Sequence, residues 1–262
     1  MNQIRPPAVA GMFYPASNRT LKNDIQHYLH EADCVQVTNP KAIIVPHAGY
    51  MYSGPIAASA YKQLIPLKEK IKHVVLLGPA HRVAFHGLAV PESDTFNTPL
   101  GNIPIDQKGI ESLATLPQVI VSEQAHQEEH SLEVQLPFLQ EILHEFSLVP
   151  LVVGEAERDE VVEVINKLWG DEHTLIVIST DLSHYHGYNE AKQLDSATSD
   201  SIVNLKPDLI GYEDACGRNG LKGLLTVAEE KGLSIELLDL RNSGDTAGDK
   251  SRVVGYGAYV LH

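Results

Sequence analysis

The sequence has few cysteines and many more acidic than basic residues. Its two cysteines, Cys34 and Cys216, exclude a disulfide scaffold and favour a reducing compartment. Lysine and arginine together number 20 and aspartate and glutamate 34, which gives a formal net charge of -14. Because a surface this acidic repels phosphate backbones and anionic lipids, we expect no nucleic-acid partner and no membrane partner.

Long apolar segments are also missing. The longest runs, such as HVVLLGPA from His73 to Ala80, are the length of a strand and far below the roughly 20 residues that span a bilayer. The first residues, MNQIRPPAVAGMFYPAS, contain no apolar stretch of signal-peptide length. No internal repeat, linker or low-complexity tract interrupts the 262 residues. We therefore expect a soluble cytoplasmic protein that folds as one domain, residues 1–262.

Short, continuous apolar runs predict strands that are covered on both faces, which is typical of a parallel sheet. They comprise residues 41–45, 73–77, 148–153 and 174–179, and two further strands are predicted at 235–240 and 253–261. Helical spacing of apolar residues predicts helices between them, at 55–64, 131–146, 158–169, 190–205 and 219–231. Pro137 is expected to kink the second helix and Gly232 to end the last. The loop 89–105 is compatible with a hairpin that leaves the main sheet.

This alternation of strands and helices predicts an α/β fold, with a mainly parallel or mixed central sheet and helices on both faces. Three predicted strands end in chemically versatile residues: one runs into His47, one into His81, and one into Asp181 and His184. Ligands of open parallel sheets bind beyond the carboxyl ends of the strands. These residues are therefore expected to line one pocket. Among the other histidines, six are interpreted as structural: His27, His30, His73, His144, His173 and His262.

Cys216 is the best candidate for a third metal ligand. It lies in the loop DACGRNG just before a predicted helix, where the helix N-terminus and Arg218 would lower the pKa of the thiol. Alternatively, Cys216 is a small buried apolar residue, as free cysteines often are. Cys34 has no comparable context. Two histidines alone make a weak metal site, so the case for a metal depends on this thiol.

Three other segments have two readings each. Glu129 and His130, just before a predicted helix, either cap that helix or reach the pocket as an acid/base or supporting group. The acidic loop 243–249 either covers the pocket or only connects strands. Tyr50, Tyr52 and Tyr185 are candidate lining residues for an aromatic or planar ligand. The sequence has no GxSxG elbow, phosphate-binding loop, HExxH or paired CxxC motif.

Seven segments together resemble one known family. They are RPPAVAGMFYP, PHAGYMYSG, LLGPAH, EEHSLEVQLPFL, STDLSHY, CGRNG and VVGYGAY, and they run in order from residue 5 to about residue 260. This pattern resembles the Memo family, whose bacterial and archaeal members are also described as protein B of the AmmeMemoRadiSam system. The resemblance implies the fold of the class III extradiol dioxygenases, which hold a non-haem iron with two histidines and a glutamate.

The same resemblance assigns residues. His47 and His81 correspond to the two metal histidines, and Cys216 takes the place of the glutamate. His184 lies where the dioxygenases keep an acid/base histidine, and Asp181 and His130 match other pocket residues. The implied cofactor is one divalent or redox metal ion, Fe(II) first, with copper or zinc as alternatives because thiolate suits them as well. The system name further implies a functional link to a radical-SAM protein.

Three functions remain open at this point. The first is a metal-dependent oxidoreductase with a His/His/Cys site, in which His184 is the acid/base and Asp181 orients it or a bound water. The second is a non-catalytic module that binds a peptide, a small ligand or a metal for a partner pathway. The third is a cysteine-dependent hydrolase or transferase with Cys216 as nucleophile.

Overall fold

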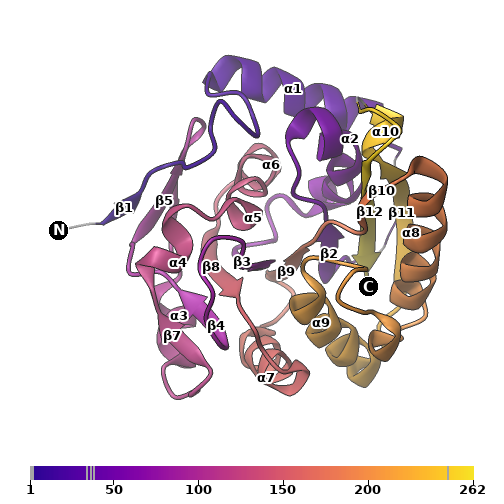
Figure 1. Cartoon of the computed structure of the whole chain (residues 1–262). Helices are drawn as coiled ribbons and strands as arrows, with labels where there is room; N and C mark the ends of the chain where they lie inside the picture. Colours follow the sequence, from indigo (N-terminus) through magenta and orange to yellow (C-terminus); the bar gives the residue numbers. More distant parts are fainter. Residues whose placement is uncertain (1–2, 34, 36, 38, 247) are drawn as a thin grey trace.

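The computed structural model describes residues 3–33, 35, 37, 39–246 and 248–262. Over these residues the main feature is a mixed sheet with the strand order β10-β12-β2-β9-β3-β8-β4-β7, and β11 pairs with β12 beside this path (Figure 1). Its strands are β2 (Ala42–Val45), β3 (His73–Pro79), β4 (Leu88–Val90), β7 (Val119–Val121), β8 (Ser147–Val153), β9 (Thr174–Ser179), β10 (His184–His186), β11 (Ile235–Asn242) and β12 (Val253–Leu261).

The centre of the sheet is parallel. Strands β2, β9, β3 and β8 are neighbours in this order and all run in the same direction. Strand β12 joins β2 in antiparallel fashion on one side, and β4 joins β8 in antiparallel fashion on the other. The predicted α/β class with a mainly parallel or mixed sheet is therefore confirmed, and the four apolar runs near residues 41–45, 73–77, 148–153 and 174–179 are its central strands.

Both faces of the sheet are covered, which explains why these runs are apolar at every position. Ile43 and Val45 of β2 enter one core, whereas Ala42 and Ile44 enter the other. The first core contains residues of α1 (Asn18–Glu31), α2 (Tyr50–Tyr61), α4 (Glu123–Gln127), α5 (His130–Glu133) and α6 (Leu136–Ile142). The second contains residues of α3 (Gln107–Leu113), α7 (Arg158–Leu168), α8 (Tyr188–Val203) and α9 (Arg218–Lys231).

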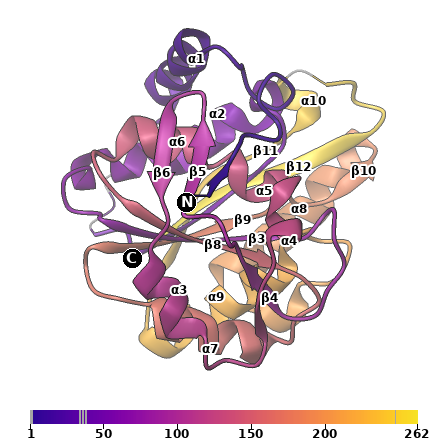
Figure 2. The same cartoon turned by 90° about the vertical axis from the view of Figure 1, so that its left-hand side faces the viewer.

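Both views show α1, α2 and α6 above the sheet and α7 and α9 below it (Figures 1 and 2). The remaining helical segments are the short α10 (Ser243–Thr246) and two 3-10 turns, Lys62–Leu67 and Pro207–Leu209. In the part of the chain that the structure describes, no helix is both long enough and apolar enough to cross a membrane.

Two predicted elements differ in the structure. The helix predicted at 131–146 is two pieces, α5 and α6. A turn at Val134 and Gln135 interrupts the regular helix, and the backbone leaves the helical conformation at Leu143. Pro137 lies in the first turn of α6, where its missing N–H costs no hydrogen bond, so it starts a helix and does not kink one. The helix predicted from Pro55 begins five residues earlier, at Tyr50.

The excursion predicted at 89–105 is present in part. Strands β5 (Thr95–Thr98) and β6 (Gly101–Pro104) form an antiparallel hairpin, and β1 (Ile4–Arg5) pairs with β5 to make a separate small sheet (Figure 2). Strand β4, at the start of the same segment, belongs to the main sheet. Gly232 ends α9 in the left-handed conformation with φ 69°, as predicted.

A buried ion pair attaches the N-terminal segment to α5. The Glu133 carboxylate accepts hydrogen bonds from Arg5 Nη1 at 2.7 Å, Tyr14 Oη at 2.6 Å, and the backbone N–H groups of Ala8 and Val9 at 2.7 and 2.9 Å. The side chains of Arg5 and Glu133 are 2% and 0% exposed. Two charges this deeply buried are stable only while both are present and fully hydrogen-bonded.

We predict that Glu133→Gln lowers the free energy of unfolding by about 3–5 kcal/mol, because Arg5 is left buried without its counter-charge. The control is Glu172→Gln, which breaks an exposed pair with Lys70 and should leave stability almost unchanged. Urea denaturation followed by circular dichroism measures both variants. A Glu133→Gln loss no larger than that of the control would show that the buried pair does not anchor α5.

Candidate metal centre

Three parallel strands deliver the predicted residues to one edge of the sheet. Strand β9 lies between β2 and β3, and the chain beyond the carboxyl ends of these strands carries Asp181, His47 and His81, respectively. All three line one open cavity of about 1100 Å³, which His184 and Cys216 also line. The sheet topology therefore brings together residues that are up to 169 positions apart in the sequence.

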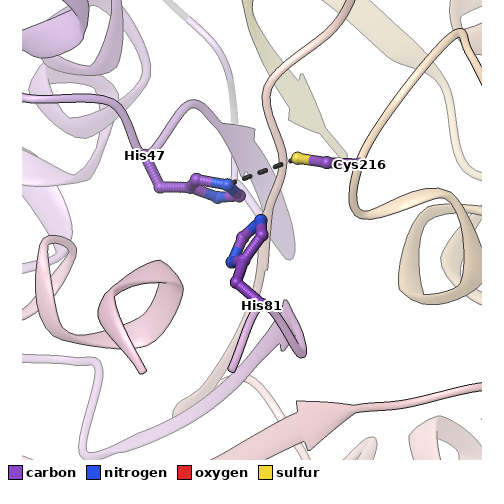
Figure 3. Close-up of side chains that lie close together, drawn as sticks. All are labelled: His47, His81 and Cys216. Carbon is purple, nitrogen blue, oxygen red and sulfur yellow. Dashed lines mark hydrogen bonds between the residues drawn. The ribbon is translucent and has the colours of Figure 1, made fainter. Parts of the chain in front are cut away.

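His47, His81 and Cys216 form a compact cluster of metal-ligating atoms. One ligand atom from each lies within 4.8 Å of the other two, and Cys216 Sγ is 3.3 Å from His47 Nε2. The two imidazole rings meet edge to face, with centroids 5.2 Å apart and an interplanar angle of 76°. Figure 3 shows both rings and the thiol turned toward a common point.

A buried carboxylate orients the ring of His81. Glu129 Oε1 lies 2.9 Å from His81 Nδ1, and Glu129 Oε2 accepts the backbone N–H of His81 at 2.6 Å. Burial alone would raise the pKa of Glu129, but hydrogen bonds from His81 and from the Ser131 amide outweigh it and lower the pKa to about 2. Because an ionised carboxylate only accepts hydrogen bonds, the proton of the neutral His81 ring lies on Nδ1, and the lone pair of Nε2 can then bind a ligand.

The ring of His47 is held on its other side by a hydroxyl. His47 Nδ1 lies 2.9 Å from Ser179 Oγ, and the His47 backbone N–H donates to Asp181 Oδ1 at 2.7 Å. In metal sites, histidine ligands generally engage their second ring nitrogen in this way. Both Nδ1 atoms are thus engaged by the protein, and both Nε2 atoms are left to face the thiol.

This donor set fits one metal ion. Metal–nitrogen and metal–sulfur bonds of about 2.0–2.3 Å place neighbouring ligand atoms roughly 3–4 Å apart, which agrees with the 3.3 Å between Nε2 and Sγ. Two imidazoles and one thiolate suit iron, copper or zinc better than magnesium or calcium, which prefer oxygen ligands.

Of the two readings of Cys216, the one with a lowered thiol pKa is wrong. Burial raises its pKa to about 12, with the Asp181 charge adding to the effect, whereas the helix N-terminus and Arg218 were expected to lower it. Arg218 lies over the Tyr212 ring instead, 4.2 Å from its centroid, and pairs with Glu155 at 3.8 Å. Burial and the neighbouring His81 also lower the pKa of His47 well below its ordinary value. Without a cation, the centre is therefore a thiol beside a neutral imidazole.

Asp181 and His184 line the cavity but are not hydrogen-bonded to each other in the described part of the chain. The Asp181 carboxylate binds the His47 backbone, so its evident contact is with the ligand loop and not with His184. Burial raises the pKa of Asp181 to about 6. His184 is half-buried, and its nearest aromatic neighbour is Tyr185, with ring centroids 5.8 Å apart.

His130 and Glu129 occupy different positions relative to the cavity. The His130 ring lines it and stacks on His81, with centroids 4.5 Å apart and an interplanar angle of 28°. Burial lowers the pKa of His130 to about 4, and His81 contributes in the same direction. Glu129 is 1% exposed and lies behind His81. It also caps α5 by accepting the Ser131 N–H, so it both caps the helix and supports the ligand.

Other expectations about the lining residues have mixed outcomes. Tyr52 and Tyr185 line the cavity, but Tyr50 is buried below it and donates to the Val134 carbonyl at 2.7 Å. The acidic loop contributes Ser243, Gly248 and Asp249 to the lining. Cys34 lies outside the described residues.

Sequence reasoning missed the residues that hold His47 from behind: Ser179, Gln135 and Ser131. Ser179 gave one signal, since it is a polar residue that directly follows the apolar run 175–178 of its strand. Gln135 gave none, because a glutamine next to a helix is usually exposed, whereas this one is 1% exposed.

Comparisons with known proteins agree on the family. A family model described as Memo-like protein matches residues 5–260. A MEMO1 family protein from Aquifex aeolicus is 38% identical over 97% of each chain, and one from Methanosarcina mazei is 36% identical over 99% of each chain. The fold resembles the crystal structure of an uncharacterized protein, JW3007, from Escherichia coli K12, with a TM-score of 0.53, 16% identity, and coverage of 84% of this chain and 99% of that one. The chain belongs to the Memo family.

Proposed function

We propose that this Memo-family protein is a metal-dependent oxidoreductase that holds one iron or copper ion with His47, His81 and Cys216. The observation that carries the proposal is the convergence of one ring nitrogen from each histidine and the Cys216 sulfur within 4.8 Å of one another, in a cavity that all three residues line. Such an ion would supply redox chemistry and an electrophilic centre for a bound substrate. Fe(II) is the first candidate, and zinc would leave the same site without redox activity.

The chain's own residues have distinct roles in this proposal. Glu129 keeps the His81 proton on Nδ1 and adds negative charge on the side of the His81 ring that faces away from the metal position. Asp181 fixes the backbone of His47. His184 is the acid/base, because it lines the cavity without a hydrogen-bond partner among the described side chains. His130, stacked on His81, closes one side of the site.

Two further parts belong to the same proposal. A reducing, cytoplasmic setting keeps the Cys216 thiol from oxidation, which matters beside a redox metal. A functional link to a radical-SAM protein places the activity in a modification pathway whose substrate is a small molecule or a peptide.

The first prediction concerns metal content. The protein purified without a histidine tag should contain about one metal ion per chain by elemental analysis, and His47→Ala and Cys216→Ser should each lose most of it. His144→Ala is the matched control, because this histidine is exposed and pairs only with Glu69. Metal near zero in the wild type, or unchanged in both ligand variants, would refute the metal centre.

The second prediction concerns pH. A cysteine binds a metal ion as the thiolate, and burial raises the pKa of Cys216 to about 12. Each bound ion must therefore displace one proton over the whole range in which the thiol is protonated. We expect the affinity for Zn(II) to rise about tenfold per pH unit from pH 7 to 9, and this slope to disappear in Cys216→Ser. A wild-type affinity that does not change over this range would show that the sulfur is not a ligand.

The third prediction separates the oxidoreductase from a non-catalytic binding module. The metal-loaded protein should consume oxygen with a catechol or ascorbate, and His184→Ala should lower that rate by about 10²-fold or more while metal content stays unchanged. His186→Ala, two residues along the same strand and paired with Glu190, is the control.

The second candidate function is the binding module, and two exposed tyrosines of the cavity favour it. Tyr185 and Tyr212 line the cavity and are 65% and 70% exposed, as contact residues for a peptide or planar ligand would be. A loaded protein that never turns over would support this candidate. The cysteine-dependent hydrolase ranks third, because a thiol whose pKa is near 12 is a poor nucleophile at neutral pH.

A further inference from the structure

Hydrogen-bond counting around Ser179 determines which ring nitrogen of His47 carries the proton. The Ser179 hydroxyl has three partners: the Ser131 carbonyl at 2.6 Å, Gln135 Nε2 at 2.8 Å and His47 Nδ1 at 2.9 Å. A hydroxyl has one proton to donate and two lone pairs that accept. The role of His47 therefore follows once the roles of the other two partners are known.

The role of Gln135 is fixed by the Pro46 carbonyl. Gln135 Nε2 lies 2.9 Å from Pro46 O, and a carbonyl oxygen only accepts, so this end of the side chain must be the NH₂ group. At the other end, Gln135 Oε1 accepts the Tyr61 hydroxyl at 2.9 Å. The second proton of the NH₂ group then points at Ser179 Oγ. Gln135 is 1% exposed, so bulk solvent does not reach these bonds.

The role of Ser131 is fixed in the same way. Its carbonyl oxygen only accepts, so it takes the single proton of the Ser179 hydroxyl. Gln135 occupies one lone pair of that hydroxyl, and only the other remains for His47. The imidazole must therefore donate from Nδ1, which leaves the lone pair of Nε2 directed at Cys216 and the cavity.

We propose that Gln135 is a positioning residue which, through Ser179, locks His47 in the tautomer with its proton on Nδ1. Gln135 does not line the cavity, and its side chain reaches the His47 ring only through Ser179. Its importance for metal binding rests on the proposed function, but the tautomer is a property of the metal-free protein and can be measured there. A neutral amide and a hydroxyl thus do for His47 what the charged Glu129 does for His81.

Both histidines are locked from the same short segment. Ser131 accepts from Ser179 through its carbonyl, and through its N–H it donates to Glu129 Oε1 at 2.9 Å. Its hydroxyl donates to the Pro79 carbonyl at the end of β3, close to His81. The close packing of Ser131 against β3 requires a glycine at position 78, since a Cβ there would lie 2.8 Å from Ser131 Oγ. One hydrogen-bonded chain therefore runs from His47 through Ser179, Ser131 and Glu129 to His81.

The direct test is made on the wild-type protein. Long-range ¹H–¹⁵N correlation spectra of the metal-free protein at neutral pH identify which ring nitrogen of His47 is protonated, with His47→Gln used for assignment. We expect a proton on Nδ1 and none on Nε2. A proton on Nε2 would overturn the proposal, whatever the metal content of the protein.

Variants test whether Gln135 and Ser179 matter for ligand binding. Ser179→Ala and Gln135→Leu should each mix the two His47 tautomers in the same spectra, and should weaken Zn(II) binding, measured against a chromophoric chelator, by about 10–100-fold. Ser183→Ala is the control, because this serine is equally buried and its hydroxyl has no partner among the described residues. Unchanged tautomers in both variants would refute the positioning role.

The outcomes separate the two proposals. A His47 proton on Nδ1 in a protein that binds no metal refutes the proposed function and leaves the positioning role intact. Metal bound at full occupancy by a protein whose metal-free form carries the His47 proton on Nε2 refutes the positioning role and leaves the metal centre intact.

Discussion

The cluster of His47, His81 and Cys216 depends on hydrogen bonds made by side chains of one short segment, residues 129–135. Glu129 holds one ring, and Gln135 holds the other through Ser179. The segment is anchored in turn by Glu133, whose carboxylate takes four hydrogen bonds from the N-terminal residues. A buried polar network with every partner satisfied is rigid, and one with a missing partner is costly, since each unmade bond loses about 1–3 kcal/mol. The N-terminal segment therefore contributes to the precision of a site that it does not itself form.

The environment of the cluster explains why a cation would be favoured there. His47 is buried and Cys216 partly buried, and Asp181 adds negative potential beside them. Burial raises the pKa of the Cys216 thiol and lowers that of the His47 imidazole, so both groups favour their uncharged forms at neutral pH. An ionised thiolate in this position needs a positive partner. Arg218 does not provide it, because its guanidinium lies against Tyr212 and Glu155. A metal ion bound by both imidazoles would.

The fold was largely predictable from the sequence, and the site only in part. Continuous apolar runs identify β2, β3, β8 and β9, and the residues that follow three of them identify His47, His81 and Asp181, because parallel strands share one edge. The break between α5 and α6 was not predictable from apolar spacing, which continues across it from Leu132 to Leu136. The supporting residues Ser179 and Gln135 act through tertiary hydrogen bonds, which leave no periodic signal. One of the two readings of Cys216 gave its pKa shift the wrong sign, because burial outweighs a nearby helix end and an arginine whose guanidinium lies over Tyr212.

The most direct test is a crystal structure of the untagged protein, with anomalous diffraction data collected at the iron, copper and zinc edges. The account predicts one anomalous peak bonded to His47 Nε2, His81 Nε2 and Cys216 Sγ, at about 2.0–2.3 Å from each. A peak coordinated by other residues, or a sulfur turned away from both rings with no peak between them, would contradict it.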